Sequence, residues 1–157
     1  MFDKTSVCCF FGHRKIIETK ELRRKLLETV ERLIVEEDVS VFLFGSRSHF
    51  DDLCHELVTA MKEKYPQIKR IYVRAEYPFI SDVYRAELLK NYEDTFFPKK
   101  IIDAGRAVYV ERNREMIRQS DFCVVYYDEA VALSRKSGTK IALTYARSQK
   151  KKCILFP

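Results

Sequence analysis

The sequence predicts an α/β protein: a three-layer, Rossmann-like domain with a mainly parallel sheet of about five strands. Short, continuous apolar runs alternate along the chain with longer segments whose apolar residues recur every three or four positions. The first two apolar runs stop at a glycine, as expected of a strand that turns sharply into a helix. Strands that are apolar throughout are buried on both faces, so helices are expected on both sides of a parallel sheet.

The first half of the chain supplies three strands and two helices in alternation. Apolar runs predict strands at residues 6–11, 39–44 and 68–73. The segment between the first two strands has an apolar face with helical spacing, formed by Leu22, Leu26, Leu27, Val30, Leu33 and Ile34. The segment after the second strand has a similar face, formed by Leu53, Leu57, Val58 and Met61.

The pattern is weaker over residues 75–106, which contain Pro78 and Pro98. In this stretch we expect a helix over about 82–91 and a short strand at 101–102. Regular elements then return, with expected bounds of 107–119 (helix), 122–127 (strand), 139–149 (helix) and 153–156 (strand). Because the chain has no internal repeat and no low-complexity linker, we expect residues 1–157 to form a single domain.

The composition is that of a globular protein whose cysteines are reduced thiols. Hydrophobic residues make up 46% of the chain and charged residues 33%. No apolar run approaches the roughly 18–20 residues of a membrane span, and the first residues lack the basic region of a signal peptide. The five cysteines have neither disulfide-framework nor zinc-site spacing. We therefore expect a cytoplasmic protein with buried, reduced thiols, no metal, no cofactor and no membrane partner.

Three of the four glycines fall at one edge of the expected sheet. Gly12 and Gly45 directly follow the first two strands, and Gly138 lies after the fourth strand at the start of a helix. Ligands of open parallel sheets bind outside the carboxyl ends of the strands, where glycine lets the backbone approach a ligand closely. A tight turn uses glycine without any ligand, but three at one edge, flanked by cations, favour a site. The neighbouring candidates are His13, Arg14, Ser46 and Asp128.

Residues 137–139, Ser-Gly-Thr, begin a helix and are candidates for contact with a phosphate. Ser137 is expected to cap the helix, which leaves the first backbone N–H groups, near Gly138 and Thr139, free for an anion. Three cations would add attraction: Arg135, Lys136 and Lys140. The alternative is an ordinary helix cap. Neither GxGxxG nor GxxxxGKS/T occurs to support classical dinucleotide or P-loop binding.

Three segments resemble the SLOG superfamily, and most closely its YpsA-like branch of unknown function. They are CFFGHR at the first strand, ERNREMIRQSDFCVVYYDE before and along the fourth, and KSGTKIALTYARSQKKKCI after it. The resemblance covers nearly the whole chain in order and is weakest over 75–106. It implies a Rossmann-like fold that binds a nucleotide or a nucleotide-derived ligand. The pocket residues that it implies are Gly12, Arg14, Gly45, Ser46, Arg112, Asn113, Ser137, Gly138 and Thr139.

One departure from the superfamily's enzymes bears on activity. The LOG phosphoribohydrolases carry PGGxGTxxE, whose glutamate is needed for hydrolysis, and Ala142 stands at that position here. Alanine has no acid or base function. We therefore expect binding without LOG-type hydrolysis, and we assign no catalytic residue.

Two other functions stay open on the sequence. A nucleotide N-glycosidase would need a relocated carboxylate, for which the candidates are Asp51, Asp52, Asp128 and Glu129. Single-stranded DNA binding of the DprA type fits the net charge of +6 and the 13% aromatic content, although Phe and Tyr fall mostly in strands. The sequence fixes neither the identity of the ligand nor whether the chain forms a homo-oligomer.

Overall fold

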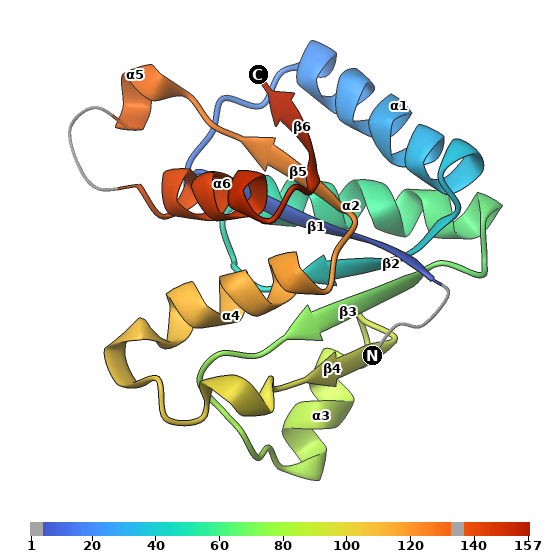
Figure 1. The fold of residues 1–157 in the computed structure, drawn as a ribbon. Coiled ribbons are helices and arrows are strands. Elements are labelled where there is room, and N and C mark those ends of the chain that lie inside the picture. Colours follow the sequence, from blue (N-terminus) through green and yellow to red (C-terminus); the bar gives the residue numbers. More distant parts are fainter. Residues whose placement is uncertain (1–4, 133–136) are drawn as a thin grey trace.

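Six strands form one sheet in the computed structural model, which describes residues 5–132 and 137–157 (Figure 1). The strands are β1 (Ser6–Gly12), β2 (Val39–Phe44), β3 (Lys69–Val73), β4 (Asp94–Phe96), β5 (Phe122–Tyr126) and β6 (Lys152–Phe156). All neighbouring pairs are parallel, so the carboxyl ends of the strands lie at one edge of the sheet. The expected fold class is confirmed, with six strands in place of about five.

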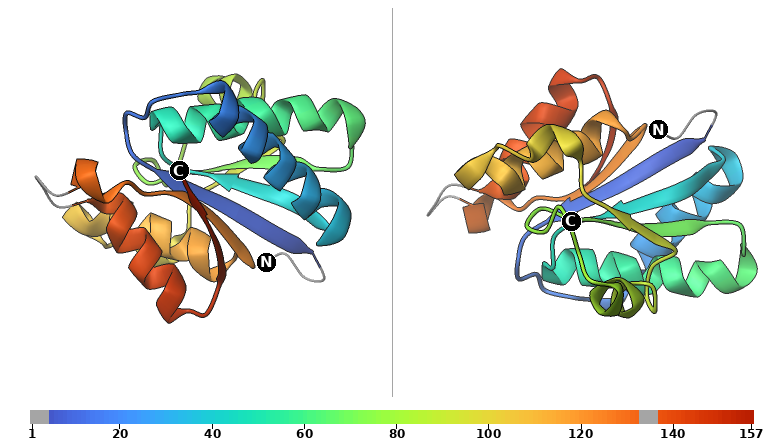
Figure 2. Two further views of the ribbon diagram at one scale, coloured as in Figure 1. Left: turned by 90° about the horizontal axis from the view of Figure 1, so that it is seen from above. Right: turned by 90° about the horizontal axis from the view of Figure 1, so that it is seen from below.

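Helices cover both faces of the sheet and complete three layers (Figure 2). The helices are α1 (Lys20–Glu36), α2 (His49–Lys64), α3 (Asp82–Leu88), α4 (Val108–Arg118), α5 (Glu129–Ala132) and α6 (Gly138–Ser148), with 3-10 turns η1 (Lys99–Ile101) and η2 (Gly105–Ala107). Helices α1 and α2 pack on one face, and α4 and α6 pack on the other. None of the helices within the described ranges is long and apolar enough to span a membrane.

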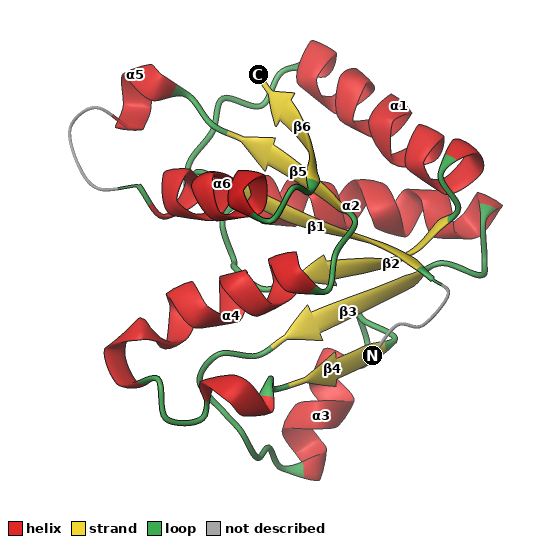
Figure 3. Ribbon diagram, viewed as in Figure 1, coloured by secondary structure: helices red, strands yellow, loops and turns green. Residues whose placement is uncertain are grey.

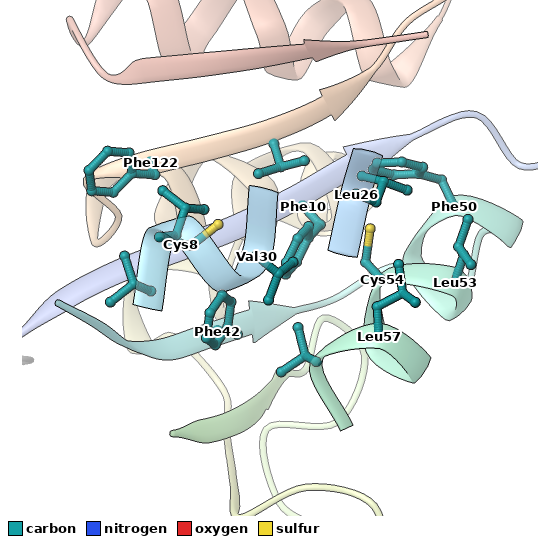
Figure 4. Close-up of a cluster of buried hydrophobic side chains, with 14 of the residues drawn as sticks. Cys8, Phe10, Leu26, Val30, Phe42, Phe50, Leu53, Cys54, Leu57 and Phe122 are labelled. Atoms are coloured by element: carbon teal, nitrogen blue, oxygen red, sulfur yellow. The ribbon is translucent and has the colours of Figure 1, made fainter. Parts of the chain in front are cut away.

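Alternate side chains of the strands supply two hydrophobic cores, one on each face of the sheet. Along β1, Cys8 and Phe10 pack toward α1 and α2 (Figure 4), whereas Cys9 and Phe11 pack toward α4 and α6. Burial on both faces explains why the strand sequences are continuous apolar runs rather than alternating ones. The expectation of buried thiols is confirmed for Cys8, Cys9, Cys54 and Cys123.

The order of strands reverses at β1, which places a switch point between β1 and β5. The chain adds β2, β3 and β4 in turn on one side of β1 and then crosses over to add β5 and β6 on the other. Ligands of open α/β sheets bind outside the carboxyl ends of the strands near such a point. The loops that follow β1, β2, β3 and β5 are therefore the segments in which a site is expected.

The stretch between β3 and α4 differs most from expectation. The predicted strand at 101–102 is wrong, because Ile101 lies in the 3-10 turn η1 and is buried there by packing. The edge of the sheet is formed instead by β4, whose three residues are too few and too polar to produce a strand pattern. An ion pair holds this edge: Arg70 Nη2 lies 2.6 Å from Glu93 Oε2. The helix expected over 82–91 is present but ends at Leu88.

Candidate functional site

A pocket with a volume of about 520 Å³ opens at the carboxyl ends of β2 and β3. We call it the Arg–Tyr pocket, because four arginines and four tyrosines line it. Its lining residues come from the loops after β1, β2 and β3, from β3 itself, from α3 and from α4. Figure 3 shows where these loops and elements lie. The lining residues are Arg14, Gly45, Ser46, Arg47, Tyr72, Arg74, Ala75, Glu76, Tyr77, Tyr84, Tyr109 and Arg112.

Arg112, on α4, ties the ends of two strands together beneath the pocket. Its Nη1 donates to the carbonyl oxygen of Gly45 at 2.7 Å and to that of Val73 at 3.3 Å, and its Nε donates to Asn113 Oδ1 at 2.9 Å. The side chain is only 4% exposed, yet Nη2 has no hydrogen-bond partner among the described residues. Burial lowers the pKa of Arg112, although the nearby Tyr72 opposes this shift. The arrangement leaves a largely buried guanidinium whose Nη2 is unpaired among the described residues but is not one of the fully buried unpaired atoms, so it is accessible at the pocket wall.

Gly45 is required at the end of β2 because Arg112 passes so close to it. A Cβ atom at this position would lie 2.7 Å from Met116 Sδ and 2.9 Å from Arg112 Nε. Carbon atoms in folded proteins do not approach other atoms this closely without displacing them. The sequence predicted a glycine that lets a ligand approach the backbone; the structure places an arginine side chain there.

Arg74 fixes the loop that follows β3. Its Nε donates to the carbonyl oxygen of Tyr77 at 3.0 Å, and its Nη1 donates to Thr95 Oγ1 at 3.1 Å. Thr95 in turn donates its hydroxyl proton to the carbonyl oxygen of Tyr72 at 2.8 Å. The guanidinium is thus satisfied largely by the protein itself, and its effect is to hold residues 75–77 against the pocket.

Arg14 and Arg47 are the two exposed arginines of the pocket. The Arg47 guanidinium lies 5.7 Å from the centre of the Tyr72 ring, a distance at which cation–π attraction operates. The Arg14 side chain makes no hydrogen bond or ion pair with any residue of the described ranges. These two side chains are accessible to an anion without disturbing the fold.

Asp51, near the start of α2, is a buried carboxyl beside this arrangement. It is 2% exposed, and Oδ1 lacks a hydrogen-bond partner in the part of the chain that the structure describes. Burial raises the pKa of Asp51 well above its ordinary value, while the charge of Arg112 acts in the opposite direction. The helix itself begins at Ser48, whose Oγ accepts from the Asp51 backbone N–H at 3.0 Å.

The structure brings only part of the predicted site together. The predicted residues that line the Arg–Tyr pocket are Arg14, Gly45, Ser46 and Arg112. Asn113 does not line it but orients Arg112 through the Nε–H to Oδ1 hydrogen bond. These residues come from two loops and one helix, and the sheet topology alone makes them neighbours.

His13 and Asp128 meet at the switch point between β1 and β5. The backbone N–H of Asp128 donates to His13 Nε2 at 2.8 Å, whereas the Asp128 carboxylate accepts from the Ala130 backbone N–H at 3.0 Å. Gly12 serves packing at this position, because a Cβ atom there would lie 2.4 Å from atoms of the Phe50 side chain. The polar groups predicted here thus join the two loops that follow β1 and β5.

Residues 137–139, which we call the Ser137 turn, form the start of α6 as expected. Ser137 is the N-cap, and its Oγ accepts from the Lys140 backbone N–H at 3.2 Å. Gly138 has open space where a Cβ atom would stand, and Thr139 is buried. None of these three residues is among the described residues that line the Arg–Tyr pocket. The neighbouring cations Arg135 and Lys136 lie outside the described residues.

Sequence reasoning missed most of the pocket. The residues not foreseen are Arg47, Tyr72, Arg74, Ala75, Glu76, Tyr77, Tyr84 and Tyr109. A signal was nevertheless present, because an arginine follows each of the first three strands within three residues: Arg14, Arg47 and Arg74. Parallel strands bring such positions to one edge of the sheet.

The carboxylates considered for an N-glycosidase lie elsewhere. Asp51 is buried, Asp52 and Glu129 are exposed, and none of them, nor Asp128, is among the described residues that line the pocket. The acidic side chain that does line it is Glu76. Within the described ranges, no group of three or more His, Cys, Asp or Glu residues is placed to hold a metal ion.

No model of a known protein family matches the chain, and a search of curated proteins found no match either. The resemblance to the SLOG superfamily therefore stays a prediction from the three quoted segments.

Proposed function

We propose that this protein binds a nucleotide or a nucleotide-derived ligand in the Arg–Tyr pocket, with an anionic group of the ligand held by arginines. The observation that supports this most is Arg112: a nearly buried guanidinium that lines the pocket while Nη2 lacks a partner among the described residues. A buried cation is costly unless it is paired, so an anion that reaches Nη2 gains a strong, charge-assisted hydrogen bond. Arg14 and Arg47 would complete the anion site from the exposed side.

The tyrosines suit the other end of such a ligand. Tyr72, Tyr84 and Tyr109 line the same pocket, and an aromatic base stacks favourably on tyrosine rings. The cavity, at about 520 Å³, lies within the range of about 300–1,000 Å³ that is usual for small-molecule sites. Aromatic and cationic side chains in one pocket of this size favour a nucleotide over a simple inorganic anion.

The Ser137 turn is the second place at which a phosphate could bind. Helix α6 has eleven residues, and its first backbone N–H groups and dipole attract anions. Ala142, where the LOG enzymes have glutamate, is 3% exposed and packs in the core on the α4 and α6 face. The proposal is therefore for a binding protein, a sensor or regulatory module, in which hydrolysis of the LOG type does not occur.

The test is calorimetric titration with a panel of nucleoside mono-, di- and triphosphates. We expect at least one to bind, with affinity reduced about tenfold or more by Arg47→Ala, because a hydrogen bond to a charged group is lost. Arg32→Ala, which removes an exposed arginine of α1 outside the pocket, is the matched control and should bind normally.

Gly138→Asp, which adds a negative charge where space is open, weakens binding only if the phosphate sits at the Ser137 turn. Absence of binding to every member of the panel would refute the proposal.

Single-stranded DNA binding is the second candidate, and one observation favours it. The aromatic side chains of Tyr77 and Tyr109 are exposed and line the pocket, and Phe79, two residues after Tyr77, is 87% exposed. Bases of a single strand stack on such side chains in a sequence-tolerant way. An oligothymidine titration at two salt concentrations separates the two functions, because strand binding would weaken steeply with salt.

A further inference from the structure

Glu76 stands out chemically in the Arg–Tyr pocket. It is the acidic residue among the described lining residues, and it shares the pocket with four arginines. Even so, its carboxylate makes no hydrogen bond or ion pair with any residue that the structure describes. Its charge still acts on the nearby Arg112, whose pKa it helps to raise against the effect of burial. A carboxylate left open beside cations is available to a ligand.

The backbone around Glu76 is held in place. Arg74 donates from Nε to the carbonyl oxygen of Tyr77 at 3.0 Å and from Nη2 to that of Pro78 at 3.4 Å. The backbone N–H of Arg74 donates to the carbonyl oxygen of Phe96 in β4 at 2.8 Å. Glu76 therefore lies on a loop fixed on both sides, which is the condition under which a side chain can select among ligands.

A carboxylate repels phosphate and accepts hydrogen bonds. Glu76 is therefore expected to contact hydrogen-bond donors of the ligand, whereas the arginines contact its anionic group. The two carboxylate oxygens accept a matched pair of N–H donors best when the donors are adjacent and coplanar. Among the common bases, guanine presents such a pair in its ring N1–H and its 2-amino group. Hypoxanthine lacks the amino group, and adenine has an acceptor at N1 that a carboxylate disfavours.

We propose that Glu76 selects the base of the ligand and that the site prefers a guanine nucleotide. This inference rests on the proposed nucleotide-binding function and adds the class of base to it. The guanine edge meets the Glu76 carboxylate, the ring lies against tyrosines of the pocket, and the phosphate meets arginines that line the same pocket.

The experiment is a calorimetric comparison of GMP, IMP and AMP on the wild-type protein, Glu76→Gln and Glu87→Gln. Glu87 is an exposed glutamate of α3 that pairs with Lys90 and does not line the pocket, so its variant is the matched control for loss of one charge. We expect the wild type and Glu87→Gln to bind GMP about tenfold to a hundredfold more tightly than IMP, since two charge-assisted bonds replace one. Glu76→Gln should lose this preference and change its affinity for IMP less than its affinity for GMP. Circular dichroism of each variant verifies that the fold is intact.

The possible results separate this inference from the function on which it rests. If none of the three nucleotides binds, the proposed function fails and the inference fails with it. If all three bind equally to the wild type and Glu76→Gln has no effect on selectivity, the selection by Glu76 is refuted while nucleotide binding stands. If binding needs Mg²⁺ and Glu76→Gln removes that need without changing base preference, Glu76 is a metal ligand and the inference is overturned.

Discussion

The Arg–Tyr pocket and the Ser137 turn lie at the same edge of the sheet, but they are built in different ways. In the pocket, Arg112 on α4 bonds to carbonyl groups at the ends of β2 and β3, and Gly45 makes room for it. At the turn, Ser137 caps its own helix, and Gly138 is in open space. One region depends on contacts between distant parts of the chain, and the other depends on residues that are neighbours in sequence.

A glycine near a site can be there for two different reasons, and the pocket and the turn give one example of each. Gly45 is set by sterics, since any side chain would collide with Arg112 and Met116. Gly138 is not set by sterics, and its backbone does not lie in the left-handed region either. A glycine that the fold does not require at a helix start is compatible with close approach by a ligand at the turn.

The largest expected effect is the difference in stability between alanine substitutions at these two glycines. Gly45→Ala should destabilise the protein by about 1–3 kcal/mol, because the added methyl group overpacks a filled site. Gly138→Ala should stay within about 0.5 kcal/mol of the wild type, as surface changes without a packing role do. Urea denaturation of both variants measures the contrast. Equal destabilisation by the two substitutions would show that the close contacts at Gly45 do not exist in solution.

A smaller effect depends on pH and concerns Asp51, the buried carboxyl whose charge interacts with Arg112. The folded protein raises the pKa of Asp51 above 3.8, so it holds a proton at pH values where the unfolded chain has lost it. Stability therefore falls as pH rises from about the unfolded pKa toward the folded one, by at most about 1.4 kcal/mol per pH unit. Asp51→Asn should remove this fall.

Melting temperatures from about pH 4 to about pH 8 provide the measurement. Asp52→Asn is the matched control, because Asp52 is the next residue of the same helix but is exposed. Parallel pH curves for the wild type and Asp51→Asn would mean that Asp51 is ionised in the folded protein over this range.

The smallest effect is expected at the cap. Ser137→Ala removes the acceptor for the Lys140 N–H and should cost about 1 kcal/mol. If the turn is only a cap, the folded Ser137→Ala variant should have the same nucleotide affinity as the wild type, as measured by calorimetry. A loss of affinity larger than the loss of stability would instead assign the turn to the phosphate, and Arg47→Ala in the same assay would reveal whether the pocket contributes.

The fold class and most of the helices and strands could be predicted from the sequence. Strands buried on both faces must be apolar throughout, and the helices that cover them need one apolar face, so both leave a periodic pattern. The same holds for the caps, since Ser137 and Lys140 are close neighbours along the chain. The edge strand β4 was missed because three residues beginning with Asp94 and Thr95 carry no period, and Arg70 and β3 stabilise it from outside.

Which of the candidate residues lie together in one site could not be predicted from the sequence and follows from the packing of the elements. Arg112 is predicted to contact the ligand, and the structure adds that its side chain bonds to Gly45 and Val73, which are distant in sequence. Glu76 and Tyr77 lie in a stretch without regular pattern, where sequence gives little information about position. The other tyrosines of the pocket lie in elements that were predicted, but nothing in the sequence shows that these elements meet. The physical reason is that propensity and periodicity act over a few residues, whereas a pocket depends on which strand ends the sheet order makes adjacent.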